Sequence, residues 1–434
     1  MPTPGSPSAA NAPEKTPWGA VLMFCGLFAI FGFVTWLNGP LITFSKLAFS
    51  LSDVEAFLVP SVFYLSYFFL ALPSAFILRK TGMKAGMALG LLLMAVGAAG
   101  FGQFASMRMF PPTLVSLFVI GAGLSLLQTA SNPYISVLGP IESGAQRIAL
   151  LGIFNKLAGA AAPFVIGTLI LNGIGQMQAQ IDAAPTTAAR ELLLNAFAAR
   201  IHLPYLVMGA FLTVIAIFVY KSPLPNISDD ANPGTGKGFW AALPQMVFGF
   251  LAIFFYVGVE VMAGDAVGTY GNGFHLPIDK TIFFTSYTMV GMLIGYICGL
   301  IAIPRFVSQE RYLVFSAVLG ILFSIGAFLT KDYVSVAFVF ALGFANAMMW
   351  PAIFPLGIRG LGKLTEFGAA FLVMGIIGGA VIPQLFAHLK DQYGFQLVFL
   401  CLMVPCYAYI LIFGVIAGRK GKATAIPADA PTDV

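Results

Sequence analysis

Residues 239–273 read FWAALPQMVFGFLAIFFYVGVEVMAGDAVGTYGNG. About 20 mainly apolar residues suffice for a helix to cross the hydrocarbon core of a bilayer, and this stretch is longer. It nevertheless contains two carboxylates, Glu260 and Asp265. A charge at bilayer depth costs at least about 2.5–3.5 kcal/mol, so such a side chain must face a wet cavity or a partner. The stretch therefore predicts a membrane-spanning helix that carries a polar functional site.

The rest of the chain has the composition of a polytopic membrane protein. Of its 434 residues, 59% are hydrophobic and only 9% are charged, whereas a soluble domain carries about 25% charged residues. This composition excludes a cytosolic enzyme, a nucleic-acid-binding protein and a disordered chain. The four cysteines lie inside apolar runs and have the spacing of neither a disulfide framework nor a zinc site. We therefore expect no cofactor and no metal centre.

Twelve apolar runs follow one another along the chain. They cover residues 18–45, 56–78, 85–107, 109–141, 148–172, 201–220, 238–274, 281–304, 312–330, 333–358, 367–389 and 392–418. The runs are too long for the strands of a membrane barrel and lack the alternation of such strands. We therefore expect an all-α membrane protein with twelve transmembrane helices.

A polar segment rich in proline and glycine, residues 221–237, divides the runs six and six. The expected organisation is an N-terminal tail (1–17), a six-helix bundle (18–220), a linker (221–239), a second six-helix bundle (240–418) and a C-terminal tail (419–434). The halves echo each other, because Gln128-x-x-x-Asn132-Pro133 in the fourth run has its counterpart in Asn346-x-x-x-Trp350-Pro351 in the tenth. A parallel repeat of two six-helix halves is typical of alternating-access carriers, whose binding site lies between the halves.

The connections between the runs indicate the orientation. If the N-terminus is cytoplasmic, the connections on that side and the tails carry 14 lysines and arginines, and those on the other side carry seven. This asymmetry predicts that both termini are cytoplasmic. The longest outer connection, at about 173–200, has Leu192, Leu193 and Phe197 at helical spacing, which predicts a short surface helix at 186–199.

Three charged side chains lie in the middle of the runs: Lys156 in the first half, and Glu260 and Asp265 in the second. A pair between them would cross the interface that a rocking carrier must open and close. Making and breaking it would change the proton affinity of the carboxylates, which is a coupling device. The alternative is a static pair that only fixes helix packing. Glycines around the two acids predict that the helix bends or unwinds near Gly264.

Amides and aromatic rings complete the candidate site. The amides are Asn38, Gln128, Asn132 and Asn155. An amide both donates and accepts hydrogen bonds, as sugar hydroxyls do, although each amide can instead join two helices. The rings are Trp36, Trp350 and Tyr270, with Tyr64 and Tyr67 as further candidates, because a flat ring offers an apolar face to a sugar. The sequence Asn38-Gly39-Pro40 also predicts a break in the first helix.

Several short motifs belong together. They are Leu37-Asn38, Gln128-Thr129-Ala130-x-Asn132-Pro133-Tyr134, Leu138-Gly139-Pro140, Phe154-Asn155, Tyr256-Val257-Gly258-x-Glu260-Val261 and Pro351-x-Ile353-Phe354-x-Leu356-Gly357-Ile358. With these motifs the chain resembles, over about residues 17–418, the bacterial sugar carriers of the major facilitator superfamily. Within that superfamily it resembles the L-fucose/proton symporter group, which includes glucose/galactose and N-acetylglucosamine carriers. The resemblance implies the major facilitator fold, a sugar substrate and a place in the bacterial inner membrane.

The chain departs from fucose symporters at two acids. They carry Asp directly after Leu-Asn, where this chain has Gly39, and Glu where it has Gln128. Those acids serve substrate binding and proton coupling in that branch, so the resemblance favours the glucose/galactose type over fucose. Many members have Ser at the positions of Lys156 and Asp265. The joint change to one base and one acid favours a pairing between the halves.

The sequence therefore predicts a carrier that imports a hexose or hexose derivative of the glucose, galactose, mannose or N-acetylglucosamine type. The amides would bind sugar hydroxyls, with Trp36, Trp350 or Tyr270 against the sugar ring. Glu260 and Asp265 would carry the cation, a proton as first choice or a sodium ion as second, and Lys156 would be their switchable partner. The expected partners are the sugar, this cation and the lipid bilayer, without nucleic acid, and we expect a monomer. Alternatives are an uncoupled facilitator with Lys156 as tethered cation, a multidrug exporter, and a membrane enzyme or a sugar sensor.

Overall fold

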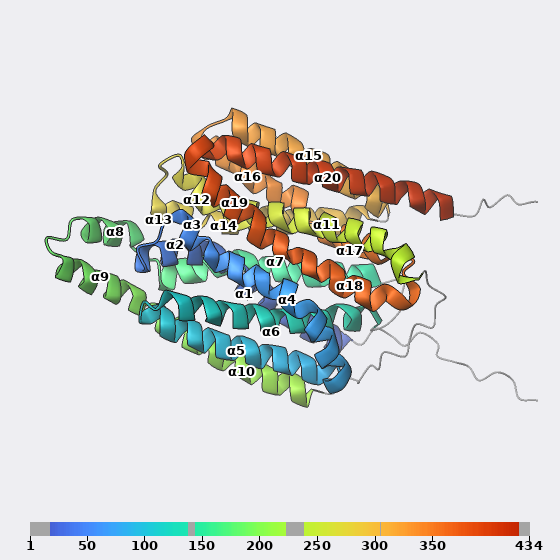
Figure 1. The fold of residues 1–434 in the computed structure, drawn as a ribbon, viewed down its shortest axis with the longest axis horizontal. Coiled ribbons are helices and arrows are strands. Elements are labelled where there is room, and N and C mark those ends of the chain that lie inside the picture. Colours follow the sequence, from blue (N-terminus) through green and yellow to red (C-terminus); the bar gives the residue numbers. More distant parts are fainter. Residues whose placement is uncertain (1–17, 138–143, 223–237, 304, 425–434) are drawn as a thin grey trace, which may run out of the picture.

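The structure, a computed structural model, describes residues 18–137, 144–222, 238–303 and 305–424. The regular structure in these ranges consists of helices. Twelve helical segments among them are long and apolar enough to cross a membrane, which confirms the predicted all-α fold and the number of spans. Figure 1 shows the long helices running side by side along one axis.

The first six spans form what we call the N half. Its helices are α1 (Trp18–Thr35), α2 (Asn38–Ala48), α3 (Asp53–Ala56), α4 (Leu58–Thr81), α5 (Met83–Ser106), α6 (Phe110–Val137), α7 (Gly144–Leu169), α8 (Ile174–Asp182), α9 (Thr187–Ala199) and α10 (His202–Lys221). The pairs α1–α2, α3–α4 and α9–α10 are each continuous apolar segments, and α8 lies in the connection before α9.

The last six spans form the C half. Its helices are α11 (Phe239–Gly264), α12 (Val267–Asn272), α13 (Ile278–Thr281), α14 (Phe284–Ala302), α15 (Gln309–Leu329), α16 (Asp332–Asn346), α17 (Met349–Ile358), α18 (Thr365–Met374), α19 (Gly378–Tyr393) and α20 (Phe395–Thr424). The 3₁₀ turns η2 (Gly362–Leu364) and η3 (Gly375–Ile377) flank α18.

Close helix packing within each half depends on small residues. In the N half, α5 packs along α6, and a methyl group at Gly90 would lie only 2.7 Å from the carbonyl oxygen of Gly123. Such approach of two backbones is how helices associate in lipid, where apolar contact between helices has no advantage over contact with acyl chains. The halves meet chiefly where α4 packs against α18 and α19 and where α7 packs against α14.

The two predicted breaks are present, among several interruptions of spans such as the one between α16 and α17. The first span breaks at Trp36 and Leu37, between α1 and α2, because Pro40 has no N–H for the hydrogen bond that a continuous helix needs. The seventh breaks directly after Gly264, between α11 and α12. These breaks place Gly39 against Asp265: a methyl group at Gly39 would lie 3.4 Å from Cα of Asp265.

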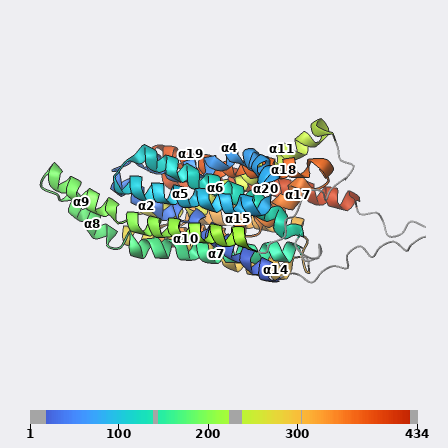
Figure 2. The same cartoon turned by 90° about the horizontal axis from the view of Figure 1, so that it is seen from below.

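The two ends of the bundle differ. Figures 1 and 2 show α8 and α9 extending beyond one end, which we call the hairpin end, while α10 ends and α11 begins at the other, the linker end. Helix α9 matches the predicted surface helix, and the Thr186 side chain caps it by accepting a hydrogen bond from the N–H of Ala189. Helix α8 was not predicted from the sequence.

Polar contacts close the hairpin end across the halves. Lys390 Nζ at the end of α19 lies 2.6 Å from Asp53 Oδ2 at the start of α3. The side-chain amide of Gln384 donates to the carbonyl oxygen of Val54 over 3.0 Å. On the other flank, the N–H of Gly175 in α8 donates to Asp279 Oδ1 over 3.1 Å. The structure therefore holds the halves together at the end that carries α8 and α9.

We predict that Asp53→Asn weakens this closure, because it removes the charge that faces Lys390. Charge-assisted hydrogen bonds contribute about 1.5–3 kcal/mol, so opening should become at least about 10-fold more frequent. The measurement is the rate at which a hydrophilic maleimide modifies a cysteine introduced at Ser61, in purified protein without its four native cysteines. Asp391→Asn is the matched control, since Asp391 binds the same lysine from the same helix end. Equal rates in the two variants would contradict the role of the Asp53–Lys390 pair.

Candidate functional site

A buried ion pair joins the two halves in the middle of the spans. Lys156 Nζ on α7 lies 2.9 Å from Glu260 Oε1 on α11. The two residues are only 6% and 8% exposed. The structure thus brings together two of the three mid-span charges that the sequence singles out. Because removing either partner leaves a buried charge alone, the pair can open only if water, a ligand or another charge takes the partner's place.

Trp36 covers this ion pair instead of offering a free ring face. The ammonium of Lys156 lies over the indole at 4.6 Å from the ring centre, which is a cation–π contact. The ring fits between glycines of both halves: methyl groups would lie 2.4 Å from Trp36 Cδ1 at Gly159 and 2.3 Å from Trp36 Cζ3 at Gly264. With 2% of its surface exposed, Trp36 acts as a wedge between the halves in this conformation.

Asp265, the third mid-span charge, forms no ion pair with Lys156, although both Lys156 and Glu260 are close enough to interact with it electrostatically. It sits at the break between α11 and α12 and is 2% exposed. The hydroxyl of Tyr64 on α4 donates to Asp265 Oδ2 over 3.1 Å, so this contact also crosses the halves. Thr285 Oγ1 on α14 donates to the carbonyl oxygen of Gly264 and fills the space beside Gly39.

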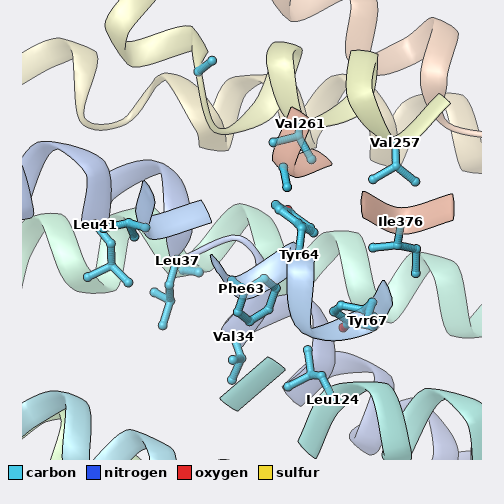
Figure 3. Packing of buried hydrophobic residues seen from close by; sticks show 14 of the residues in the cluster. Val34, Leu37, Leu41, Phe63, Tyr64, Tyr67, Leu124, Val257, Val261 and Ile376 are labelled. Carbon is cyan, nitrogen blue, oxygen red and sulfur yellow. The ribbon is translucent and has the colours of Figure 1, made fainter. Parts of the chain in front are cut away.

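Apolar side chains seal the surroundings of Tyr64. Figure 3 shows Tyr64 reaching from α4 toward Val261 of α11, with Phe63, Leu37 and Val34 of the N half packed behind it. All five of these residues are at most 5% exposed. The contact between Tyr64 and Asp265 is therefore shielded from water, which strengthens its electrostatic component.

The predicted amides divide into two kinds. Nδ2 of Asn38 and Oε1 of Gln128 are buried and make no hydrogen bond to any described residue, so they are available to a ligand or to water. Gln128 also lines a small hollow beside Leu27 and Phe31. Asn155, in contrast, donates from Nδ2 to the carbonyl oxygen of Phe28 over 3.2 Å and so joins α7 to α1. The side chain of Asn132 lies outside the described residues.

The remaining predicted rings lie in different places. Trp350 is half-buried, stacks on Phe354 with ring centres 5.5 Å apart, and lies 6.4 Å from the ring of Tyr256 one turn before Glu260. Tyr270 is fully buried in the packing of the C half, where its hydroxyl bonds to Ser335 Oγ at 2.7 Å. The structure thus puts Trp350 near the ion pair and leaves Tyr270 among the helices at the hairpin end.

Two polar residues escaped the sequence analysis. Thr285 gave no signal, because a threonine in a span usually bonds to its own helix. Asn346 on α16 is fully buried, accepts a hydrogen bond at Oδ1 from the Tyr407 hydroxyl over 2.8 Å, and has an unpartnered Nδ2. The internal repeat was the available signal for Asn346, since it aligns this residue with Gln128.

The side-chain chemistry suits a neutral polar ligand and a titratable group. Among the described residues, His, Cys, Asp and Glu form no group of three that could hold a metal ion. The site instead combines one compensated charge pair, one carboxyl group without a basic partner, and amide groups with free hydrogen-bonding capacity. These groups belong to both halves, so a relative movement of the halves changes their contacts.

Comparison with known proteins places these features in a family. The family description of the Major Facilitator Superfamily matches residues 22–383. The chain is 30% identical over 429 residues to a glucose/galactose transporter of Brucella abortus biovar 1 (strain 9-941), covering 97% of this chain and 99% of that protein. It is also 30% identical over 402 residues to an L-fucose-proton symporter of Escherichia coli (strain K12), covering 90% and 91%.

A solved structure agrees with the fold. The crystal structure of the major facilitator transporter FucP in the outward conformation matches with a TM-score of 0.73 and 27% sequence identity, covering 92% of this chain and 98% of that chain. These relatives are named as transporters, in agreement with the sequence analysis, which expected a carrier and no enzyme.

We predict that Lys156→Met destabilises the protein strongly and that adding Glu260→Gln restores most of the loss. Removing one partner of a buried ion pair costs about 3–5 kcal/mol because the other charge stays buried and alone, whereas replacing both partners can be nearly neutral. The measurement is thermal unfolding of the purified single and double variants in detergent. If the effects of the two substitutions simply add, the two groups do not compensate each other as the structure indicates.

Proposed function

The chain belongs to the Major Facilitator Superfamily, and from this membership we propose that it imports a hexose or hexose derivative together with a cation. The relatives named as a glucose/galactose transporter and as a fucose-proton symporter support this substrate class and this coupling. The observation that carries the proposal is the buried Lys156–Glu260 pair between the halves, because a carrier must break this contact when it changes sides.

The free amide groups support a sugar as the ligand. Asn38 and Gln128 are buried with unpartnered polar atoms, and such atoms cost free energy until a ligand or water satisfies them. Hydroxyl groups of a hexose supply both donors and acceptors. Trp350 is the half-buried ring near the ion pair and would contact the apolar face of the sugar. Asn132 and Asn155 complete the proposed binding set, and Tyr270 stays its weakest member because its hydroxyl is engaged elsewhere.

The coupling role falls on Glu260 and Asp265, with Lys156 as the switchable partner. When the halves separate around the sugar, the Lys156–Glu260 contact breaks. The Lys156 ammonium must then be hydrated, and the Glu260 carboxylate must be hydrated, protonated or bound to a cation. A proton is the first choice for the coupled ion, and a sodium ion is the second, since carboxylates are suitable oxygen ligands for it. The proposed orientation has both termini in the cytoplasm and the chain in a bacterial inner membrane, which the excess of basic residues at the linker end supports.

Transport by the purified protein in proteoliposomes tests this function. We predict exchange of at least one labelled hexose from a panel of glucose, galactose, mannose and N-acetylglucosamine, and accumulation only when a pH or sodium gradient is imposed. Exchange without gradient-driven accumulation would indicate an uncoupled facilitator in which Lys156 is the tethered cation. Failure to exchange any sugar of the panel would contradict the proposed substrate class.

Two neutralising variants test the coupling residues. We predict that Glu260→Gln and Asp265→Asn each abolish uphill accumulation but retain exchange, because exchange needs the sugar site and not the release of the cation. Glu310→Gln is the control, since Glu310 forms its ion pair with Arg359 inside the C half at the linker end. Accumulation at the wild-type level in both site variants would refute the coupling roles.

A further inference from the structure

Asp265 carries a charge that the structure does not balance. The ion pairs of the described residues include Lys156 with Glu260, and none of them involves Asp265. The residue is 98% buried, its Oδ1 atom makes no hydrogen bond within the described part of the chain, and its Oδ2 atom receives one from Tyr64. A carboxylate ion in such a place is strongly disfavoured, because the neutral donors beside it, the Tyr64 hydroxyl and the backbone N–H of Gly39, cannot replace its hydration shell.

We propose that Asp265 carries the coupled proton and that Tyr64 is the positioning residue that links this protonation to closure of the hairpin end. The inference rests on the proposed function as a symporter, and it assigns different roles to Glu260 and Asp265. Glu260 is already neutralised by Lys156 in this conformation, so it needs no proton while the halves are together. Asp265 has no such partner, so a proton on its carboxyl group is what allows it to be sealed between the halves.

The position of Tyr64 makes the link between proton and closure. Tyr64 belongs to α4 of the N half, and Asp265 belongs to the break after α11 in the C half. Ser61, one turn before Tyr64 on α4, donates over 2.7 Å to the carbonyl oxygen of Phe57, and its Oγ lies 3.2 Å from the carbonyl oxygen of Ala380 on α19. The same face of α4 therefore contacts the C half. The Tyr64–Asp265 hydrogen bond therefore joins the two halves at this end, and its strength depends on whether the carboxyl group is ionised.

The space around Asp265 favours a proton over a metal cation. A methyl group at Gly39 would lie 2.4 Å from Thr285 Oγ1, and Thr285 is itself engaged with the carbonyl oxygen of Gly264. A sodium ion needs several oxygen ligands around it and room for its own volume. A proton adds to one carboxylate oxygen and needs no additional space.

The neighbouring titratable groups set the expected pH dependence. They are Tyr64 on α4, Lys156 on α7 and Glu260 on α11. Tyr64 donates to Asp265 in either protonation state, but a hydrogen bond to an ionised carboxylate is about twice as strong as one to a neutral carboxyl group. Loss of the Tyr64 hydroxyl therefore destabilises the closed state more when Asp265 is ionised than when it is protonated. Without Tyr64, the halves close at this end only if Asp265 carries its proton.

The test compares Tyr64→Phe with Tyr67→Phe. Both tyrosines are buried on α4, but the hydroxyl of Tyr67 makes no described bond to Asp265, so its variant is the matched control. The first measurement is modification of a cysteine at Ser61 by a hydrophilic maleimide over a range of pH, which needs no sugar. Modification should rise at alkaline pH as the hairpin end opens. In Tyr64→Phe this rise should move to lower pH by about 0.5–1 unit, a 3- to 10-fold difference in the mid-range.

Asp265→Asn separates this role from a structural one. With a permanently neutral side chain, the cysteine should stay protected at every pH, and adding Tyr64→Phe should introduce no pH dependence. Identical profiles of Tyr64→Phe and Tyr67→Phe, or a wild-type profile in Asp265→Asn, would overturn the inference. Protection at alkaline pH that depends on sodium ions would overturn it in favour of a metal cation.

Sugar exchange at equal pH on both sides is the second measurement. Exchange by the wild type should fall at alkaline pH, fall earlier in Tyr64→Phe, and be independent of pH in Asp265→Asn. Absence of hexose exchange in all variants, together with the expected cysteine profiles, would refute the proposed substrate class and leave the switch at Asp265 supported. Exchange with cysteine profiles that do not respond to Tyr64 would refute the switch and keep the transport function.

Discussion

The structure depends on the high free-energy cost of an isolated charge in a low-dielectric interior. Lys156 and Glu260 meet this constraint by pairing across the halves, at 2.9 Å and almost out of contact with solvent. Neither half can satisfy its charge alone, so the interface between the halves is stable only when they fit together or when something polar enters between them. A protein that must open this interface therefore needs a polar ligand, water or a proton to stabilise the separated charges.

Glycine makes the fit possible at the points where the charges lie. Trp36 reaches Lys156 because Gly159 and Gly264 leave room for its ring, and Asp265 is sealed because Gly39 allows its backbone to approach. Both Gly39 and Gly264 lie next to a break in a span, one in each half. A side chain at either position would separate the halves, so the breaks and the charges form one arrangement. Gly39 is also the position where fucose symporters carry an acid, and here the acid that lies against it is Asp265 of the other half.

The sequence was sufficient for the architecture and for part of the site. Length and apolarity predicted the spans, and Asn38-Gly39-Pro40 and Gly264 predicted the breaks, because these signals are local. The charge of Lys156 and Glu260 predicted that they would need partners. The sequence could not predict which acid Lys156 binds, nor that Tyr64 donates a hydrogen bond to Asp265, because both contacts depend on how the halves pack. Trp36 illustrates the same limit, since a tryptophan in the middle of a span looks the same in the sequence whether it packs between the halves or contacts a sugar.

The contacts at the hairpin end and in the middle of the spans differ in what can replace them. The Asp53–Lys390 pair lies near the end of the bundle, and both of its residues are only partly buried, which leaves access for water when the pair opens. Lys156, Glu260 and Asp265 are 6%, 8% and 2% exposed as whole residues. The middle contacts have no such access until the halves have moved. Opening from the hairpin end would therefore begin with the partly exposed Asp53–Lys390 pair and reach Tyr64–Asp265 and Lys156–Glu260 afterwards. In that order Asp265 and Glu260 lose their partners only after water has entered between the halves. Neither carboxyl group is then left charged and unpaired in a water-free interior.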